Sequence, residues 1–107
     1  RLKLQQQQIE LSLKEEKIKQ KLAEKEAAKL RLKKEQLIIK NDMALTSNLK
    51  NFNAILNVCD CDIEMPEINY EKEALLSKDL KEIKKEYLII FKNMTSNYLD
   101  KLNACND

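Results

Sequence analysis

The residues best suited to chemistry are three cysteines: Cys59 and Cys61 form a Cys-Asp-Cys motif, and Cys105 lies near the C-terminus. Metal sites usually combine several Cys or His ligands, and the chain has no histidine, so we expect no metal site. We expect no disulfide within the chain, because a Cys-X-Cys bridge is strained and Cys105 is predicted to lie far from the motif. We interpret the cysteines as reduced thiols, which are typical of an intracellular protein of the nucleus or cytoplasm.

Other motifs for catalysis or ligand binding are absent from the sequence. Without histidine or glycine, the chain has neither the commonest general base nor a glycine-rich loop that could hold a phosphate group. No nucleophile stands beside a recognisable base. We therefore expect a protein that is not an enzyme, with no catalytic residue, cofactor or small-molecule substrate.

Charge is distributed unevenly along the chain, whose net charge is +2. Residues 1–36 carry eleven Lys or Arg and six Glu, whereas residues 37–107 carry nine Lys and twelve Asp or Glu. The basic residues of the first part are interleaved with Glu and spread around the predicted helix, which favours a solvated flank over a nucleic-acid site. They are Lys14, Lys17, Lys21, Lys25, Lys29, Arg31, Lys33 and Lys34. Binding of this arm to nucleic acid, an acidic membrane surface or a filament is the alternative interpretation.

The secondary structure that positions these residues is predicted from the lack of helix-breaking residues. The chain has no glycine, and its only proline is Pro66. Compact domains use glycine where a turn needs positive φ, so we expect few tight turns. With 36% charged and 43% hydrophobic residues, the chain can bury apolar surface along the stripes of long helices. The predicted fold is all-α: an elongated coiled coil of two long helices, within a dimer or a larger helical bundle.

A first helix is predicted over residues 1–58, with a basic arm at 1–36 that consists mostly of strong helix formers. Apolar residues occur on two sides of this arm, so either both sides meet partners or the helix frays towards its N-terminus. One side carries Leu4, Leu11, Ile18 and Leu22, and the nearly opposite side carries Leu2, Ile9 and Leu13.

A heptad seam is predicted at residues 37–58, where apolar residues follow spacings of 7, 4, 3 and 4. Asp42 occupies the missing core position of this seam. Either this carboxylate fixes the register of the pairing, or the seam begins after it. The seam residues are Ile38, Leu45, Leu49, Phe52 and Leu56.

Residues 59–69 are predicted to form an acidic elbow, because Pro66 disfavours helix at the residue before it. A second helix is predicted over residues 70–106, with a seam at Leu76, Leu80, Ile83, Tyr87, Ile90, Met94, Tyr98 and Leu102. We expect the two helices to fold back as an antiparallel hairpin, and one rod kinked at Pro66 is the alternative.

The second helix is apolar nearly all round at Tyr87 to Phe91, and this run is too short to cross a membrane, which takes roughly 20 residues. Ile89 and Phe91 lie off the seam, so we expect a further helix to bury them. The complete predicted interface consists of Leu4, Leu11, Ile18, Leu22, Ile38, Leu45, Leu49, Phe52, Leu56, Leu76, Leu80, Ile83, Tyr87, Ile89, Ile90, Phe91, Met94, Tyr98 and Leu102.

These patterns together indicate a structural protein-interaction module. We expect a coiled-coil segment that mediates homo-oligomerisation or binds a partner subunit in a larger eukaryotic complex, with no nucleic acid as partner. Kinetochore, spindle-pole, transcription-mediator and tethering assemblies are analogies of architecture alone. The sequence begins without Met, and we expect it to be a fragment of a longer protein.

Overall fold

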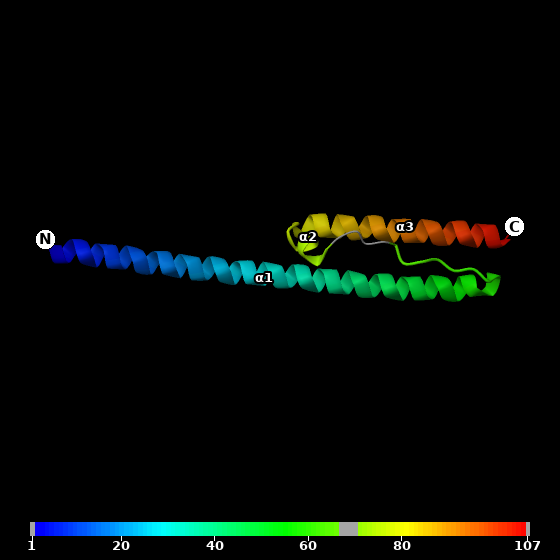
Figure 1. Ribbon diagram of the computed structural model, residues 1–107, viewed down its shortest axis with the longest axis horizontal. Coiled ribbons are helices and arrows are strands. Elements are labelled where there is room, and N and C mark those ends of the chain that lie inside the picture. Colours follow the sequence, from blue (N-terminus) through cyan, green and yellow to red (C-terminus); the bar gives the residue numbers. More distant parts are fainter. Residues whose placement is uncertain (1, 67–70, 107) are drawn as a thin grey trace. The chain divides into compact units, whose positions relative to one another are not determined.

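The computed structural model describes residues 2–66 and 71–106. Its elements in chain order are α1 (Leu2–Leu56), the 3-10 helix η1 (Asn57–Cys59), α2 (Lys72–Leu76) and α3 (Leu80–Asn106). Figure 1 labels the three α-helices. No strand occurs in these described ranges, so the predicted all-α class is confirmed. The chain divides into two compact units, unit 1 at Arg1–Lys33 and unit 2 at Lys34–Asp107.

Unit 1 consists, in its described part, of the N-terminal portion of α1. It is helical because Lys, Glu, Gln, Leu and Ala predominate and neither glycine nor proline interrupts them. All side chains of residues 3–33 are exposed. From here on, the arm means residues 2–33 of α1, which lie within the basic arm predicted at residues 1–36.

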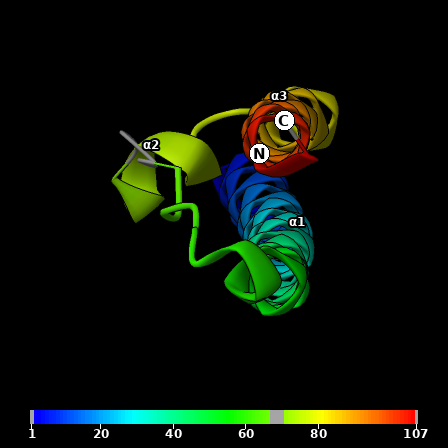
Figure 2. The ribbon, with the colours of Figure 1, turned by 90° about the vertical axis from the view of Figure 1, so that its right-hand side faces the viewer.

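Unit 2 holds the hydrophobic core, to which four segments contribute. Figure 2 shows α2 and the connecting chain on one side of the paired helices α1 and α3. Leu75 and Leu76 of α2 and Ile63 of the connecting chain are buried there against both long helices. The other buried members are Ile38, Leu45 and Leu56 of α1 and Ile83, Tyr87, Ile90 and Met94 of α3.

Four contacts along unit 2 show the relative direction of α1 and α3. Lys34 Nζ donates a hydrogen bond to the carbonyl oxygen of Leu76 at 3.1 Å, which places the start of unit 2 beside α2. Further along, Tyr87 Oη donates to Asp42 Oδ1 at 2.7 Å. The rings of Phe52 and Tyr98 stack with centroids 4.1 Å apart, and Cys59 and Cys105 form a disulfide across a Cα–Cα distance of 5.9 Å.

In these four contacts, the residue number of the partner in α2 or α3 rises as the residue number on the α1 side rises. The helices α1 and α3 therefore run parallel, and the predicted antiparallel hairpin is wrong. The sequence separation is 45 for the hydrogen bond of Tyr87 with Asp42 and 46 for the disulfide. In an antiparallel pair, partner numbers would fall as those of α1 rise. The direction is possible because residues 60–71 can span about 40 Å when extended, whereas α1 rises about 38 Å between the levels of Lys34 and Cys59.

Asp60 starts the return of the chain without a glycine. Its φ of 56° and ψ of 33° are left-handed, a conformation that Asp tolerates better than most residues. The amide of Asp60 donates to the carbonyl of Asn57, and the amide of Cys61 donates to the carbonyl of Leu56. These two bonds form a Schellman motif, which satisfies the last carbonyls of the helix and turns the chain.

Asn53 then fixes the returning chain against α1. Its side-chain amide donates to the carbonyl of Ile63 at 3.0 Å and its Oδ1 accepts from the amide of Ile63 at 2.8 Å. The Ile63 side chain is buried in the core. Backbone bonds and apolar burial therefore act at the same residue, which aligns the connecting chain along the paired helices.

The predicted single helix over 70–106 is wrong at residues 77–79, where α2 ends and α3 has not begun. Asp79 Oδ1 accepts a hydrogen bond from the amide of Glu82 at 2.8 Å, which is the bond of a helix N-cap. Lys78 also pairs with Glu86 of α3. The predicted start of the second helix at residue 70 lies outside the described residues.

The structure distinguishes between the two interpretations of Asp42, because Ile38 before it is already buried in the core. The Asp42 residue is exposed at the edge of the core, where its carboxylate accepts a hydrogen bond from the hydroxyl of Tyr87. Tyr87 is only 2% exposed. Burial of the Tyr87 ring, and then the hydrogen bond and charge of Asp42, raise the pKa of the Tyr87 phenol above its usual value. Asp42 thus supports the pairing of α1 with α3 in this register.

We expect Tyr87→Phe to destabilise unit 2 by about 1 kcal/mol at neutral pH, because Asp42 loses its hydroxyl donor. Folding raises the pKa of Tyr87, so above about pH 10 the folded chain keeps a proton that the unfolded chain has lost. Wild-type stability therefore falls with rising pH in this range, and the gap to the variant narrows. Urea unfolding followed by circular dichroism at pH 7 to 11 measures both effects.

Tyr98→Phe is the matched control, since it keeps the ring that stacks on Phe52 and removes a hydroxyl for which the described residues provide no hydrogen-bond partner. Its stability should stay within about 0.5 kcal/mol of the wild type. Equal effects of the two substitutions would contradict the role of the bond between Asp42 and Tyr87.

Candidate functional site

The arm presents large apolar side chains to solvent along its whole described length. Eight Leu or Ile side chains between residues 3 and 33 have 45% to 65% of their surface exposed. They are Leu4, Ile9, Leu11, Leu13, Ile18, Leu22, Leu30 and Leu32. Exposed apolar surface of this extent is typical of an interaction site.

One side of the arm combines apolar and basic residues and contains no acidic residue. At 100° per residue, its members fall within a sector of about 100° around the helix. We call this sector the basic face; it consists of Lys3, Leu4, Gln7, Leu11, Lys14, Ile18, Lys21, Leu22, Lys25, Lys29 and Leu32. The interpretation that basic residues are spread around the helix is correct for Lys17, Arg31 and Lys33 but misses this face.

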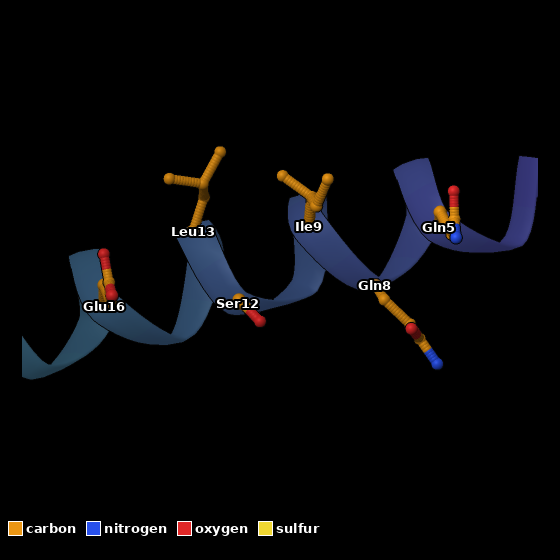
Figure 3. A pocket seen from close by; sticks show the side chains of 6 residues that line it. All are labelled: Gln5, Gln8, Ile9, Ser12, Leu13 and Glu16. Carbon is orange, nitrogen blue, oxygen red and sulfur yellow. The ribbon is translucent and has the colours of Figure 1, made fainter. Parts of the chain in front are cut away.

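The opposite side of the arm carries Ile9 and Leu13, which project in the same direction in Figure 3. Together with Gln5, Gln8, Ser12 and Glu16 they outline a shallow hollow. Because all six residues belong to one helix, this hollow is open helix surface and does not enclose a ligand. The arm is thus apolar on two sides, as the sequence predicts.

Unit 2 carries a groove between the connecting chain and α3. Three carboxylates and one lysine line it, together with apolar residues and one amide. The connecting chain contributes Asp62, Ile63, Glu64, Met65 and Pro66, and α3 contributes Asn97, Asp100, Lys101 and Ala104. We call this surface the acidic groove.

The predicted seam residues of unit 2 pack within the chain. Leu49, Phe52, Phe91, Tyr98 and Leu102 are half-buried against the buried members of the core, and Leu80 is also half-buried. Phe91, which we expect from the sequence to be buried by a further helix, is half-buried within unit 2, where its ring lines the groove between α1 and α3 with Leu37 and Leu88. Ile89 is 58% exposed, as expected for a residue off the seam.

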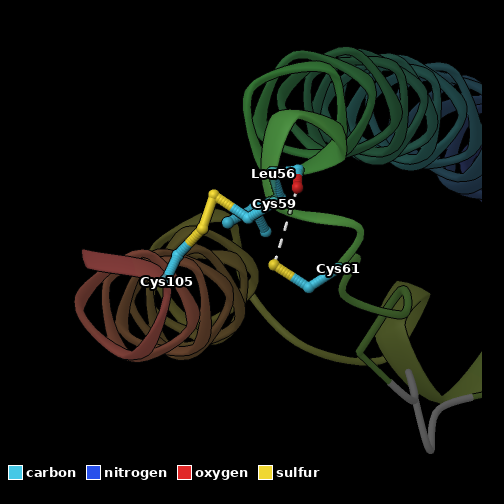
Figure 4. The surroundings of a disulfide bond; sticks show 4 residues. All are labelled: Leu56, Cys59, Cys61 and Cys105. Carbon is cyan, nitrogen blue, oxygen red and sulfur yellow. Dashed lines mark hydrogen bonds between the residues drawn. A yellow bond between two sulfur atoms is a disulfide. The ribbon is translucent and has the colours of Figure 1, made fainter. Parts of the chain in front are cut away.

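The cysteines differ from both sequence expectations. Cys59 at the end of η1 is linked to Cys105 near the end of α3, so the predictions of reduced thiols and of no intrachain disulfide are wrong. Parallel helices bring both C-terminal ends together, whereas the expected antiparallel hairpin placed Cys105 at the opposite end. Figure 4 shows the bond beside Leu56.

Cys61 is the free cysteine in the described part of the chain and is half-buried. Its Sγ donates to the carbonyl of Leu56 at 3.5 Å, as the dashed line in Figure 4 marks. Disulfides are typical of oxidising compartments. The predicted nuclear or cytoplasmic location rested on reduced thiols and loses that support.

Within residues 2–66 and 71–106, no cluster of three or more His, Cys, Asp or Glu side chains is arranged to hold a metal ion. None of the helices described in these ranges combines the length and apolar character needed to span a membrane.

Comparison with known proteins gives no relative for this chain: no protein family, no characterised protein and no solved structure matches it. The arguments about function therefore rest on the surfaces of the two units.

We expect loss of the disulfide in Cys105→Ser, or after reduction of the wild type, to destabilise unit 2 by about 4 kcal/mol. Cross-linking residues 46 apart restricts the unfolded chain by this amount in the chain-entropy model. Urea unfolding with and without reductant measures the loss.

Cys61→Ser is the control and should leave the response to reductant unchanged, because the disulfide does not involve this thiol. Thiol titration of the unreduced, unfolded wild type should detect one free thiol per chain. Three free thiols would contradict the bond between Cys59 and Cys105.

Proposed function

We propose that the chain is a helical protein-interaction module, in which unit 2 is a folded anchor and the arm is the assembly surface. The observation that carries this proposal is the contrast between the two units. Unit 2 buries its seam residues within the chain, whereas all eight Leu and Ile side chains between residues 3 and 33 are exposed.

Burial on a partner helix would stabilise such an assembly substantially. A Leu or Ile side chain contributes about 1.5 to 3 kcal/mol when fully buried, so side chains that are already half-covered contribute about 1 kcal/mol each. Four of them on one face contribute about 4 kcal/mol in total, about half of the roughly 8 kcal/mol that micromolar affinity requires, so the apolar surface of the partner must contribute as well. Apolar residues on two sides support a bundle in which the arm contacts more than one helix.

By analogy of architecture, the module belongs in a larger eukaryotic assembly. Its role there is oligomerisation or the joining of subunits, and not catalysis.

Polyanion binding is a second candidate function, and the basic face favours it. Lys14, Lys21, Lys25 and Lys29 share this face without an intervening carboxylate. Such a surface attracts phosphate groups with strong salt dependence. Apolar residues between the lysines favour a protein partner over a solvated polyanion, so this function ranks second.

We expect the double variant Leu11→Gln/Ile18→Gln to weaken self-association at least about tenfold, because two side chains lose their burial on the partner. Glutamine is a good helix former, so helix content should be preserved. Sedimentation equilibrium between about 1 and 100 μM, a range set by the expected micromolar affinity, measures association, and circular dichroism measures helix content.

Lys17→Gln, at an exposed position outside both the basic face and the hollow beside Ile9 and Leu13, is the control and should associate like the wild type. Unchanged association in the double variant contradicts the proposed role of the arm. A wild-type chain that stays monomeric at every concentration contradicts self-assembly.

A further inference from the structure

We propose that the acidic groove of unit 2 binds the basic face of the arm from a second copy of the chain. The inference rests on the proposed assembly function and adds to it the partner and the docking site.

The groove has the composition that suits a basic amphipathic helix. Asp62, Glu64 and Asp100 are exposed carboxylates along it, and Lys101 is the single cation among its lining residues. Apolar groups of Ile63, Met65, Pro66 and Ala104 lie between these charges. The basic face offers the complementary pattern, with Leu11, Ile18 and Leu22 between lysines.

The wall that carries two of these carboxylates is held in place before any partner binds. Asp62 and Glu64 flank Ile63, whose backbone makes two hydrogen bonds with Asn53 and whose side chain is buried. Asp100 extends from α3, which forms the other wall. A preorganised site avoids part of the ordering cost that opposes association.

The charges of the two surfaces are opposite. The basic face carries five lysines and no carboxylate, a net charge of +5. The acidic groove is lined by three carboxylates and one lysine, a net charge of −2. Charge complementarity of this kind directs association and fixes which surfaces meet.

The alternative groove, between α1 and α3, does not suit the basic face. It is lined by Lys40 and Lys84 beside Leu37, Leu88 and Phe91, so lysines of the arm would meet like charges there. Like charges at an interface disfavour the wrong pairing.

A second copy is the simplest partner, because every copy carries both complementary surfaces. In a two-fold dimer, the arm of each copy would occupy the groove of the other, so one symmetry operation covers both arms. No other protein is needed to supply either charge.

A charge-exchange experiment tests this pairing. The groove variant is Asp62→Lys/Glu64→Lys, and the arm variant is Lys14→Glu/Lys21→Glu; all four positions are exposed, so the fold should be retained. Each variant alone should self-associate at least about tenfold more weakly than the wild type, because attraction becomes repulsion at both contacts. Mixed in equal amounts, the two variants should associate again, since each arm then meets an oppositely charged groove.

The matched control variants reverse the same number of charges at positions outside the two proposed surfaces. Glu71→Lys/Glu82→Lys lies outside the lining of the groove, and Lys17→Glu/Lys19→Glu lies outside the basic face. Both controls should associate within about threefold of the wild type, as expected for exposed charges away from the contact. Sedimentation velocity at low and high salt measures all variants, and circular dichroism checks their helix content.

Three results overturn the inference: wild-type association of the groove variant, no recovery in the mixture, or equal losses in the controls. If the charge variants associate normally while Leu11→Gln/Ile18→Gln does not, the groove assignment fails and the proposed function stands. If the wild type itself is monomeric, both self-assembly and the groove assignment fail.

Discussion

The structure of unit 2 depends on the return of the chain after α1. Asp60 turns the backbone, and the paired hydrogen bonds between Asn53 and Ile63 hold the returning segment along α1. As a result, α2 lies at the level of Lys34, and α3, which follows it, runs parallel to α1. The stacking of Phe52 on Tyr98 and the disulfide at the shared C-terminal end both follow from this path. The acidic groove follows as well, because the connecting chain forms one of its walls.

The same path separates two kinds of surface. Unit 2 uses α2 and Ile63 to cover one side of its helix pair, and it therefore has a core of its own. The arm has exposed apolar residues, and residues 1–33 carry ten of the 20 Lys and Arg residues of the chain. A helix with this composition is stabilised chiefly by tertiary contacts, which a partner would supply. Folding and assembly are thus assigned to different parts of the sequence.

The periodicity of apolar residues predicted the helices and their buried sides, but it did not predict the direction of the helices. The spacing of Ile38, Leu45, Ile83 and Met94 predicted helices and buried stripes, and these residues are buried. Helix direction depends on the path of the connecting chain, which has no periodicity, so the antiparallel prediction failed and the disulfide was missed. The absence of glycine did not exclude a left-handed turn, because Asp60 adopts it. At the candidate site, the apolar sides of the arm were predicted, but the basic face was hidden by Glu residues that alternate with lysines in sequence and lie elsewhere around the helix.

The central claim is that α1 and α3 run parallel, and distances between spin labels test it most directly. Labels at Lys50 and Ser96, in a Cys61→Ser chain that keeps its disulfide, should lie about 10 to 20 Å apart, as on neighbouring helices at one level. Labels at Lys50 and Ser77 should lie about 25 to 35 Å apart, because Ser77 is close to the level of Lys34 and each residue adds about 1.5 Å of helical rise. A short distance from Lys50 to Ser77 combined with a long one to Ser96 would establish an antiparallel hairpin and contradict the account.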